Sequence, residues 1–241
     1  MNDPKTGPGS LGTAERMATV GAASANAISH KAKGEHETEL GAEHSVSLPQ
    51  VQALLQSWPE APKKAANQML EQYGPPNEAT PTKLFWYRAG PWKRILVTSD
   101  VITHNFPAPH SDYITQWIDY HVPVEKFDEI GRYDGSCLVD RTAGEVAARC
   151  DSEAANMITI NLMHEIVSGA KTVEEARKIY AENMAAYMLG RPAPYAERLM
   201  VPASAQPTQD PDQSMISGAM LHQGLGKVKD VVTGSEGRAP T

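Results

Sequence analysis

The aromatic residues of this 241-residue chain are confined to its middle, and this limits the part of the chain that can fold unaided. The sequence contains 3 Phe, 4 Trp and 8 Tyr, and all of them except Tyr195 lie between Trp58 and Tyr187. Large apolar side chains offset the conformational entropy that a chain loses on folding, because each of them buries a large area. We therefore predict one domain over residues 47–190, with an N-terminal arm over 1–46 and a C-terminal arm over 191–241.

The two arms are poor in large apolar side chains. Residues 1–46 are rich in Gly, Ala, Ser and charged residues, which predicts disorder unless a partner orders them. The C-terminal arm is rich in Pro and Gly, but apolar residues recur near helical spacing within 215–232. Each glycine there costs about 1 kcal/mol in a helix, so we predict a docking helix that forms on a partner. Its contact residues are Ile216, Met220, Leu225 and Val228. A disordered tail with incidental apolar residues is the alternative.

Charge and cysteine content exclude several classes of protein. The formal net charge of −7 argues against nucleic acid as a partner, because duplex binding depends on Lys and Arg that neutralise phosphates. No apolar run is long enough for a membrane span, and the N-terminus lacks the features of a signal peptide. Two cysteines, Cys137 and Cys150, fit a reducing compartment. The sequence therefore predicts a soluble, cytoplasmic protein.

The predicted elements of the domain follow one another as two helices, three strands, a short helix, two strands and two helices. Strands grouped in hairpins, rather than alternating with crossover helices, indicate an antiparallel sheet. We predict the α+β class, with a sheet of about five strands, two hairpins plus one strand, covered by helices. The segment 114–122 could also begin a helix, but its alternating apolar residues favour a strand. In the second hairpin, a coherent apolar face requires a loop of two or four residues and places Cys137 roughly across from Cys150.

The segment 103–122 concentrates residues that can bind a divalent transition metal. They are His104, His110, Asp112, Asp119 and His121, of which the last two are further ligands or support for the ligands. Their spacing matches neither HExxH nor a Cys/His finger. The two prolines of the segment also fit a solvated connection between strands. A metal site and an ordinary polar loop therefore both remain open.

Three further features could form binding sites. On a predicted helix, Asn161 and His164 could line a small-molecule pocket with His164 as a general base, although such residues more often form a solvated helix face. Trp92 follows a turn at Gly90-Pro91, where it could remain partly exposed as a binding anchor. Cys137 and Cys150 could form a redox pair or simply pack in the core.

No motif in the sequence assigns a catalytic residue. The glycine-containing loops match neither a dinucleotide-binding nor a P-loop pattern, and no GxSxG nucleophile elbow is present. We therefore expect a non-catalytic binding or assembly protein, without a cofactor, whose arms dock on a protein partner or on neighbouring subunits of a homo-oligomer. The alternatives are a metal-dependent enzyme or metal-binding protein that uses the His/Asp cluster at 104–121, and a small-molecule pocket near His164.

Overall fold

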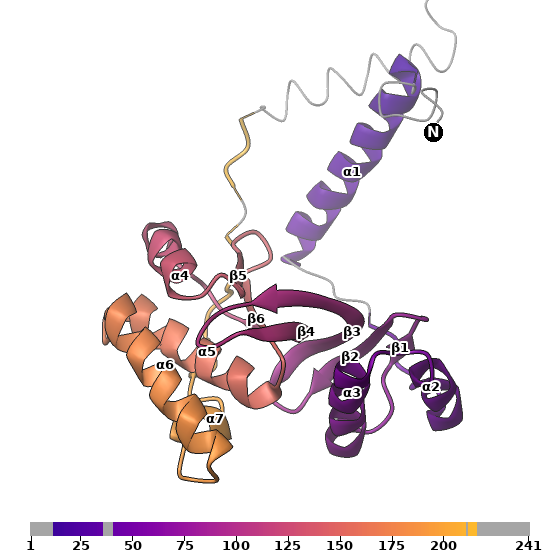
Figure 1. The fold of residues 1–241 in the computed structure, drawn as a ribbon. Coiled ribbons are helices and arrows are strands. Elements are labelled where there is room, and N and C mark those ends of the chain that lie inside the picture. Colours follow the sequence, from indigo (N-terminus) through magenta and orange to yellow (C-terminus); the bar gives the residue numbers. More distant parts are fainter. Residues whose placement is uncertain (1–11, 36–40, 211, 216–241) are drawn as a thin grey trace, which may run out of the picture. The chain divides into compact units, whose positions relative to one another are not determined.

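The computed structural model describes residues 12–35, 41–210 and 212–215 (Figure 1). The chain divides into two compact units, residues 1–38 with 212–241, and residues 39–211. In the first unit, α1 (Thr13–Lys33) is an alanine-rich helix that ends at Gly34. The predicted contact residues of the docking helix, from Ile216 to Val228, lie outside the described residues, so that docking role stays a prediction.

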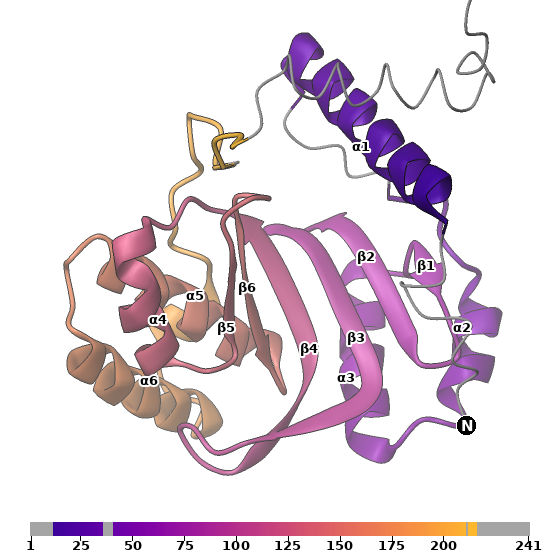
Figure 2. The same cartoon turned by 90° about the horizontal axis from the view of Figure 1, so that it is seen from above.

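The second unit is built on a six-stranded antiparallel sheet with the strand order β1-β2-β3-β4-β6-β5 (Figure 2). The strands are β1 (Glu78–Ala79), β2 (Lys83–Ala89), β3 (Trp92–His104), β4 (His110–Asp119), β5 (Cys137–Asp140) and β6 (Glu145–Cys150). The predicted α+β class and the antiparallel sheet are confirmed. The extra strand, β1, has only two residues, which is too short to produce an alternating pattern.

Helices cover the sheet. They are α2 (Leu48–Leu55), α3 (Glu60–Tyr73), the 3-10 helix η3 (Val124–Lys126), α4 (Phe127–Tyr133), α5 (Glu153–Val167), α6 (Val173–Met188) and α7 (Pro194–Glu197). Helix α3 packs against β3, and α5 packs against β4 and β6 on the same side of the sheet (Figure 1). Helix α5 is buried on most of its surface because α6 and α7 cover the side that faces away from the sheet. Among the described residues, no helix is long and apolar enough to cross a membrane.

Local capping signals fix the helix starts near the site. Thr172 and Glu175 form the reciprocal capping box at the start of α6. At α5 the N-cap is Ser152, whose hydroxyl accepts from the Ala155 N–H at 3.4 Å, and Asp151 therefore lies one residue before the cap. At α2, the N-cap residue Ser47 makes no side-chain hydrogen bond to the backbone of the helix, and its Oγ donates to the side chain of Gln50 at 2.6 Å.

The second hairpin has the four-residue loop that a coherent apolar face requires. Val139 pairs with Val146, and Cys137 pairs with Ala148, two positions away from Cys150. Cys150 pairs across the other edge of β6 with Ile114. Both cysteines are buried and free. The predicted register of this hairpin is therefore confirmed. Cys137 and Cys150 share one face, and Cys150 lies two residues beyond the position directly opposite Cys137.

Candidate functional site

The end of the β3–β4 hairpin brings together three of the predicted metal ligands. His104 and His110 are directly opposite each other in the register, and their ring centroids are 5.0 Å apart. Asp112 follows His110 by two residues, which places both side chains on the same face of β4. One ligand atom from each of the three residues lies within 4.8 Å of the others. The hairpin register therefore creates a compact His-His-Asp cluster.

The carboxylate of Asp112 lies between the two imidazoles. Its Oδ1 is 3.1 Å from His110 Nε2, and its Oδ2 is 3.6 Å from His104 Nδ1. Asp112 is fully buried, and both histidine side chains are largely covered. A buried carboxylate is costly unless hydrogen bonds or cations compensate its charge. The site must therefore provide that compensation.

The outer nitrogen of each imidazole faces an oxygen. His110 Nδ1 is 2.8 Å from the carbonyl oxygen of Ala108, which can only accept, so this nitrogen carries the proton. In the neutral ring, the lone pair of His110 Nε2 is then directed toward the cluster. His104 Nε2 is 3.6 Å from Asp134 Oδ1. Metal-ligating histidines usually have such an acceptor on the second nitrogen, because it fixes the tautomer and the ring orientation.

Three buried polar side-chain atoms of the site have no hydrogen-bond partner. They are His104 Nδ1, Asp112 Oδ1 and Arg149 Nε, and within the described residues only Asn156 Oδ1 shares this property. Arg149 Nε is 3.7 Å from Asp112 Oδ2, which is an ion-pair distance. Buried polar atoms nearly always have a partner in the protein, a bound water or an ion. A bound water or a cation between these atoms would give them partners.

The loop between α4 and β5 contributes hydrogen bonds to the cluster and to the residues around it. Ser136 donates its hydroxyl to Asp112 Oδ2 at 2.5 Å. Asp134 accepts from the backbone N–H of Ser136 at 2.8 Å and from Thr159 Oγ1 at 3.3 Å. Burial raises the pKa of Asp134 above its usual value. No sequence signal points to Asp134 or Ser136 as parts of the site, because they come from a different segment that only the tertiary fold brings close.

Cys150 contacts the cluster without belonging to the three-residue group. Its Sγ is 3.2 Å from His110 Nε2 and 4.0 Å from Tyr180 Oη. Burial, followed by the charge of Asp151, raises the pKa of the Cys150 thiol well above its usual value. The thiol is therefore protonated at neutral pH and can donate to His110. This environment does not favour the reactive thiolate that a redox pair needs.

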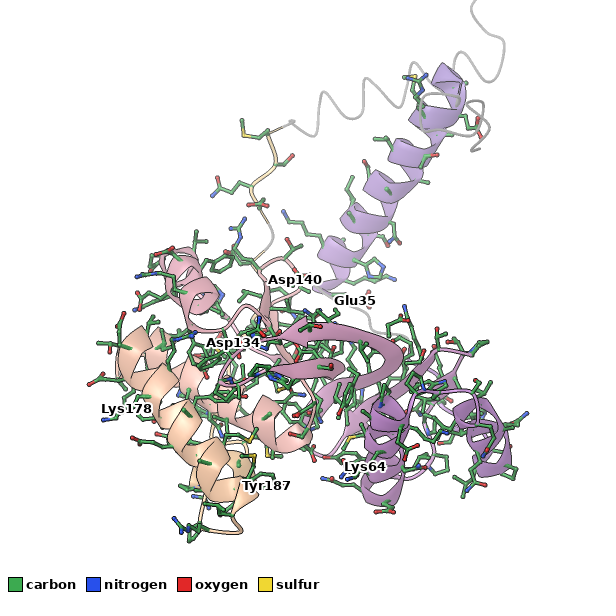
Figure 3. The ribbon with its side chains drawn as sticks, viewed as in Figure 1. Glu35, Lys64, Asp134, Asp140, Lys178 and Tyr187 are labelled. Carbon is green, nitrogen blue, oxygen red and sulfur yellow. The ribbon has the colours of Figure 1, made fainter. Side chains whose placement is uncertain are left out.

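A pocket of about 740 Å³ adjoins the cluster. His110, Cys150 and Asp151 contribute one side of its lining, and the residues that follow the cis peptide bond at Phe106-Pro107 contribute a further side. The two remaining walls come from α3 and α6, represented by Lys64 and Tyr187 in Figure 3. A small molecule in this pocket would reach His110 directly.

The other two predicted ligands do not join the cluster. Asp119 forms an ion pair with Lys93 Nζ at 2.8 Å and leaves 55 % of its side chain exposed. His121 lies in an exposed position just beyond the end of β4. Along β4, His110 and Asp112 are separated by two residues and share one face, whereas Asp119 is separated from Asp112 by an odd number of residues. Because side chains alternate between the faces of a strand, Asp119 projects to the face opposite the cluster.

The three remaining predicted binding residues are occupied by internal contacts. Trp92 is only 1 % exposed and donates its indole N–H to Glu153 Oε1 at 2.5 Å, so the expected exposure of Trp92 is wrong. The turn before it is at the surface, but the indole points into the core. Asn161 donates to the carbonyl oxygens of Tyr195 and Arg198, and accepts from the Met200 N–H at 2.7 Å.

His164 Nδ1 is 2.8 Å from the hydroxyl oxygen of Tyr120, and the two rings meet edge to face. Neither Asn161 nor His164 lines the pocket beside His110. The Asn161 amide has a structural role, because its hydrogen bonds hold the backbone of α7 and of the residues that follow it against α5.

Comparison of the chain with models of protein families, with curated proteins and with solved structures finds no match.

Proposed function

We propose that the protein binds one divalent transition-metal ion through His104, His110 and Asp112 and uses it on a small molecule. One observation carries this proposal. Two imidazole nitrogens and a fully buried carboxylate face one another, and neither His104 Nδ1 nor Asp112 Oδ1 has a hydrogen-bond partner. A cation bound between these atoms would satisfy both of them and would offset the buried charge.

The distances between the donor atoms support a metal of this kind. Zinc lies about 2.0 to 2.2 Å from nitrogen and oxygen ligands, so neighbouring donors of one tetrahedral ion are about 3.3 Å apart. The separation from His110 Nε2 to Asp112 Oδ1 is 3.1 Å, and that from His104 Nδ1 to Asp112 Oδ2 is 3.6 Å. With one ligand atom from each residue, the three atoms lie within 4.8 Å of one another, so a bound ion would draw the side chains closer together. Two imidazoles and one carboxylate suit zinc, iron(II) or manganese.

The number of protein ligands favours a reactive site over a structural one. Structural zinc sites have four protein ligands, whereas catalytic sites have three and keep a position for water or substrate. When bound, the ion would supply Lewis acidity at that position. His110 forms part of the pocket lining, so a ligand can approach from that side. Asp134 and Ser136 would orient His104 and Asp112, respectively.

Metal content tests the proposal directly. The full-length protein, purified without a chelator or a histidine tag, would be analysed by mass spectrometry of its metals, and the metal-free protein would be titrated with Zn²⁺, Fe²⁺ and Mn²⁺ by calorimetry. We expect about one ion per chain, and a loss of affinity of at least about tenfold in His104→Ala, His110→Ala and Asp112→Asn. His121→Ala is the matched control, because this exposed histidine lies outside the cluster. A wild-type protein that takes up none of the three metals, or an Asp112→Asn variant that retains full affinity, would refute the proposal.

A further inference from the structure

The lining of the pocket beside the His-His-Asp cluster combines apolar side chains, mainly from α6 and from residues 107–109, with polar side chains that include Gln68, Tyr113 and Ser152. Its walls carry the methyl groups of alanines and the side chains of methionines and prolines: Ala65, Pro107, Ala181, Met184, Ala185 and Met188. The ionisable groups His110, Cys150 and Asp151 are neighbours in the lining, with Cys150 Sγ 3.2 Å from His110 Nε2, and Lys64 on α3 is an exposed cation of the lining. A lining with an apolar α6 side and a cluster of ionisable groups fits a ligand that is itself divided into an apolar body and a polar head.

The α6 wall exposes large apolar side chains to solvent. Met188 is 74 % exposed and Tyr187 is 48 % exposed, and both belong to the pocket lining. Exposed apolar surface around a concave site is typical of a ligand groove, because covering it with a ligand removes it from water. Methionine is unbranched and adapts its shape, which suits a flexible hydrocarbon chain better than a rigid ring system.

The His110 side of the lining determines the head group. His110 belongs both to the pocket lining and to the His-His-Asp cluster, so a head group beside His110 is adjacent to the proposed metal position. Zinc, iron(II) and manganese accept carboxylate oxygen as a ligand. Lys64 and Asp151, the lysine and the aspartate of the lining, have opposite formal charges. The preference for an anionic head therefore comes from the metal ion rather than from the walls.

We infer that this pocket binds a medium-chain aliphatic monocarboxylate, with its carboxylate on the metal and its chain along the groove between α3 and α6. The inference rests on the proposed metal site. It also makes a claim that the metal site alone does not make, namely that affinity depends on the length of the hydrocarbon chain.

A chain-length series tests this inference. Acetate, hexanoate and decanoate would be titrated by calorimetry into full-length protein whose metal content has been measured, and into the metal-free form. Each methylene that enters the groove should strengthen binding about fourfold. Decanoate should therefore bind at least about 100-fold more tightly than acetate to the metal-loaded protein. It should bind clearly more weakly to the metal-free protein.

Two variants of α6 locate the chain. Ala185→Phe places a ring in the groove and should weaken decanoate at least about tenfold without changing acetate or metal content. Glu182→Phe is the matched control, since it adds the same ring to an exposed position of α6 outside the lining. The inference is overturned if affinity does not rise with chain length, if Ala185→Phe leaves decanoate unaffected, or if removal of the metal does not weaken decanoate. A protein without metal would instead refute the proposed function on which the inference rests.

Discussion

Glu153, the first residue of α5, accepts hydrogen bonds from three other elements of the fold, and its replacement should destabilise the protein strongly. Its Oε1 accepts from the hydroxyl of Tyr73 at 2.5 Å, from the indole N–H of Trp92 at 2.5 Å and from the amide of Gln116 at 3.1 Å. These donors come from α3, β3 and β4. One carboxylate oxygen therefore ties two strands and a helix to the start of α5.

The cost of Glu153→Ala follows from the burial of the donors. Trp92 and Gln116 are 1 % and 0 % exposed, so their N–H groups would remain buried without an acceptor. An unsatisfied buried donor costs about 1 to 3 kcal/mol. The Tyr73 hydroxyl is only partly buried and can turn to water. With the lost interaction of the carboxylate with the N-terminus of α5, worth about 0.3 to 1 kcal/mol, the sum over the two donors and this interaction is about 2 to 7 kcal/mol. Glu153→Gln keeps an acceptor oxygen and should cost about 1 to 2 kcal/mol.

Urea unfolding, followed by circular dichroism and tryptophan fluorescence, measures these changes in the free energy of unfolding. Glu182→Ala is the control, because this exposed residue of α6 has only a 3.9 Å ion pair with Lys178 and should change stability by less than about 0.5 kcal/mol. If Glu153→Ala lost less than about 1 kcal/mol, or no more than Glu153→Gln, the reasoning from buried donors would be refuted.

Three other changes have defined outcomes. Ile158→Ala removes a fully buried side chain of α5 and should lower the free energy of unfolding by about 2 to 5 kcal/mol, measured by the same urea titration; a loss below about 1 kcal/mol would contradict this. Gly144→Ala should cost about 2 kcal/mol or more, since Gly144 has φ +67° and an added Cβ would meet the backbone of Thr208; a neutral substitution would show that the 208–210 segment moves freely. Burial and the hydrogen bond to Glu165 raise the pKa of Tyr195 to about 12, above its unfolded value of about 10. The folded state therefore holds this proton more tightly, and the resulting stability is present below pH 10 and is lost as the pH rises from about 10 to 12. Tyr195→Phe should reduce the pH dependence of the free energy of unfolding between about pH 10 and 12. If the variant and the wild type lose stability equally over this range, the prediction is contradicted.

Much of the fold follows from local patterns in the sequence. The Thr172 and Glu175 capping box begins α6, because both partners lie within one turn and need no tertiary contact. Alternation of apolar residues correctly identifies β4 as a strand rather than a helix. Trp92 is an instructive failure, since its position beside a turn says nothing about which way the indole points. The acceptor of its buried indole N–H is Glu153, which is far away in the sequence.

The candidate site is predictable only in part. Alternation along a strand is sufficient to group His110 with Asp112 and to separate Asp119 from them. The position of His104 opposite His110 requires the hairpin register, which the sequence does not determine because the register shifts within β3 between Val97 and Ile102. Asp134 and Ser136 belong to a segment that the sheet order brings beside β4 through β6, and a single sequence contains no signal for that contact.

The choice between a metal ion and a simple ion pair depends on two atoms. Ser136 already donates to Asp112 Oδ2, and Arg149 also faces that oxygen, so neither accounts for Oδ1. A protonated His110 could donate from Nε2 to Oδ1, which would explain the 3.1 Å contact. It would still leave His104 Nδ1 buried without a partner. A metal ion accounts for both Oδ1 and Nδ1 together with the fixed tautomer of His110, whereas the ion pair accounts for only one of them. The state of His104 Nδ1 is therefore decisive: a metal bound at this atom should shift its ¹⁵N resonance when metal is added to labelled protein, and an ion pair would leave that resonance unchanged.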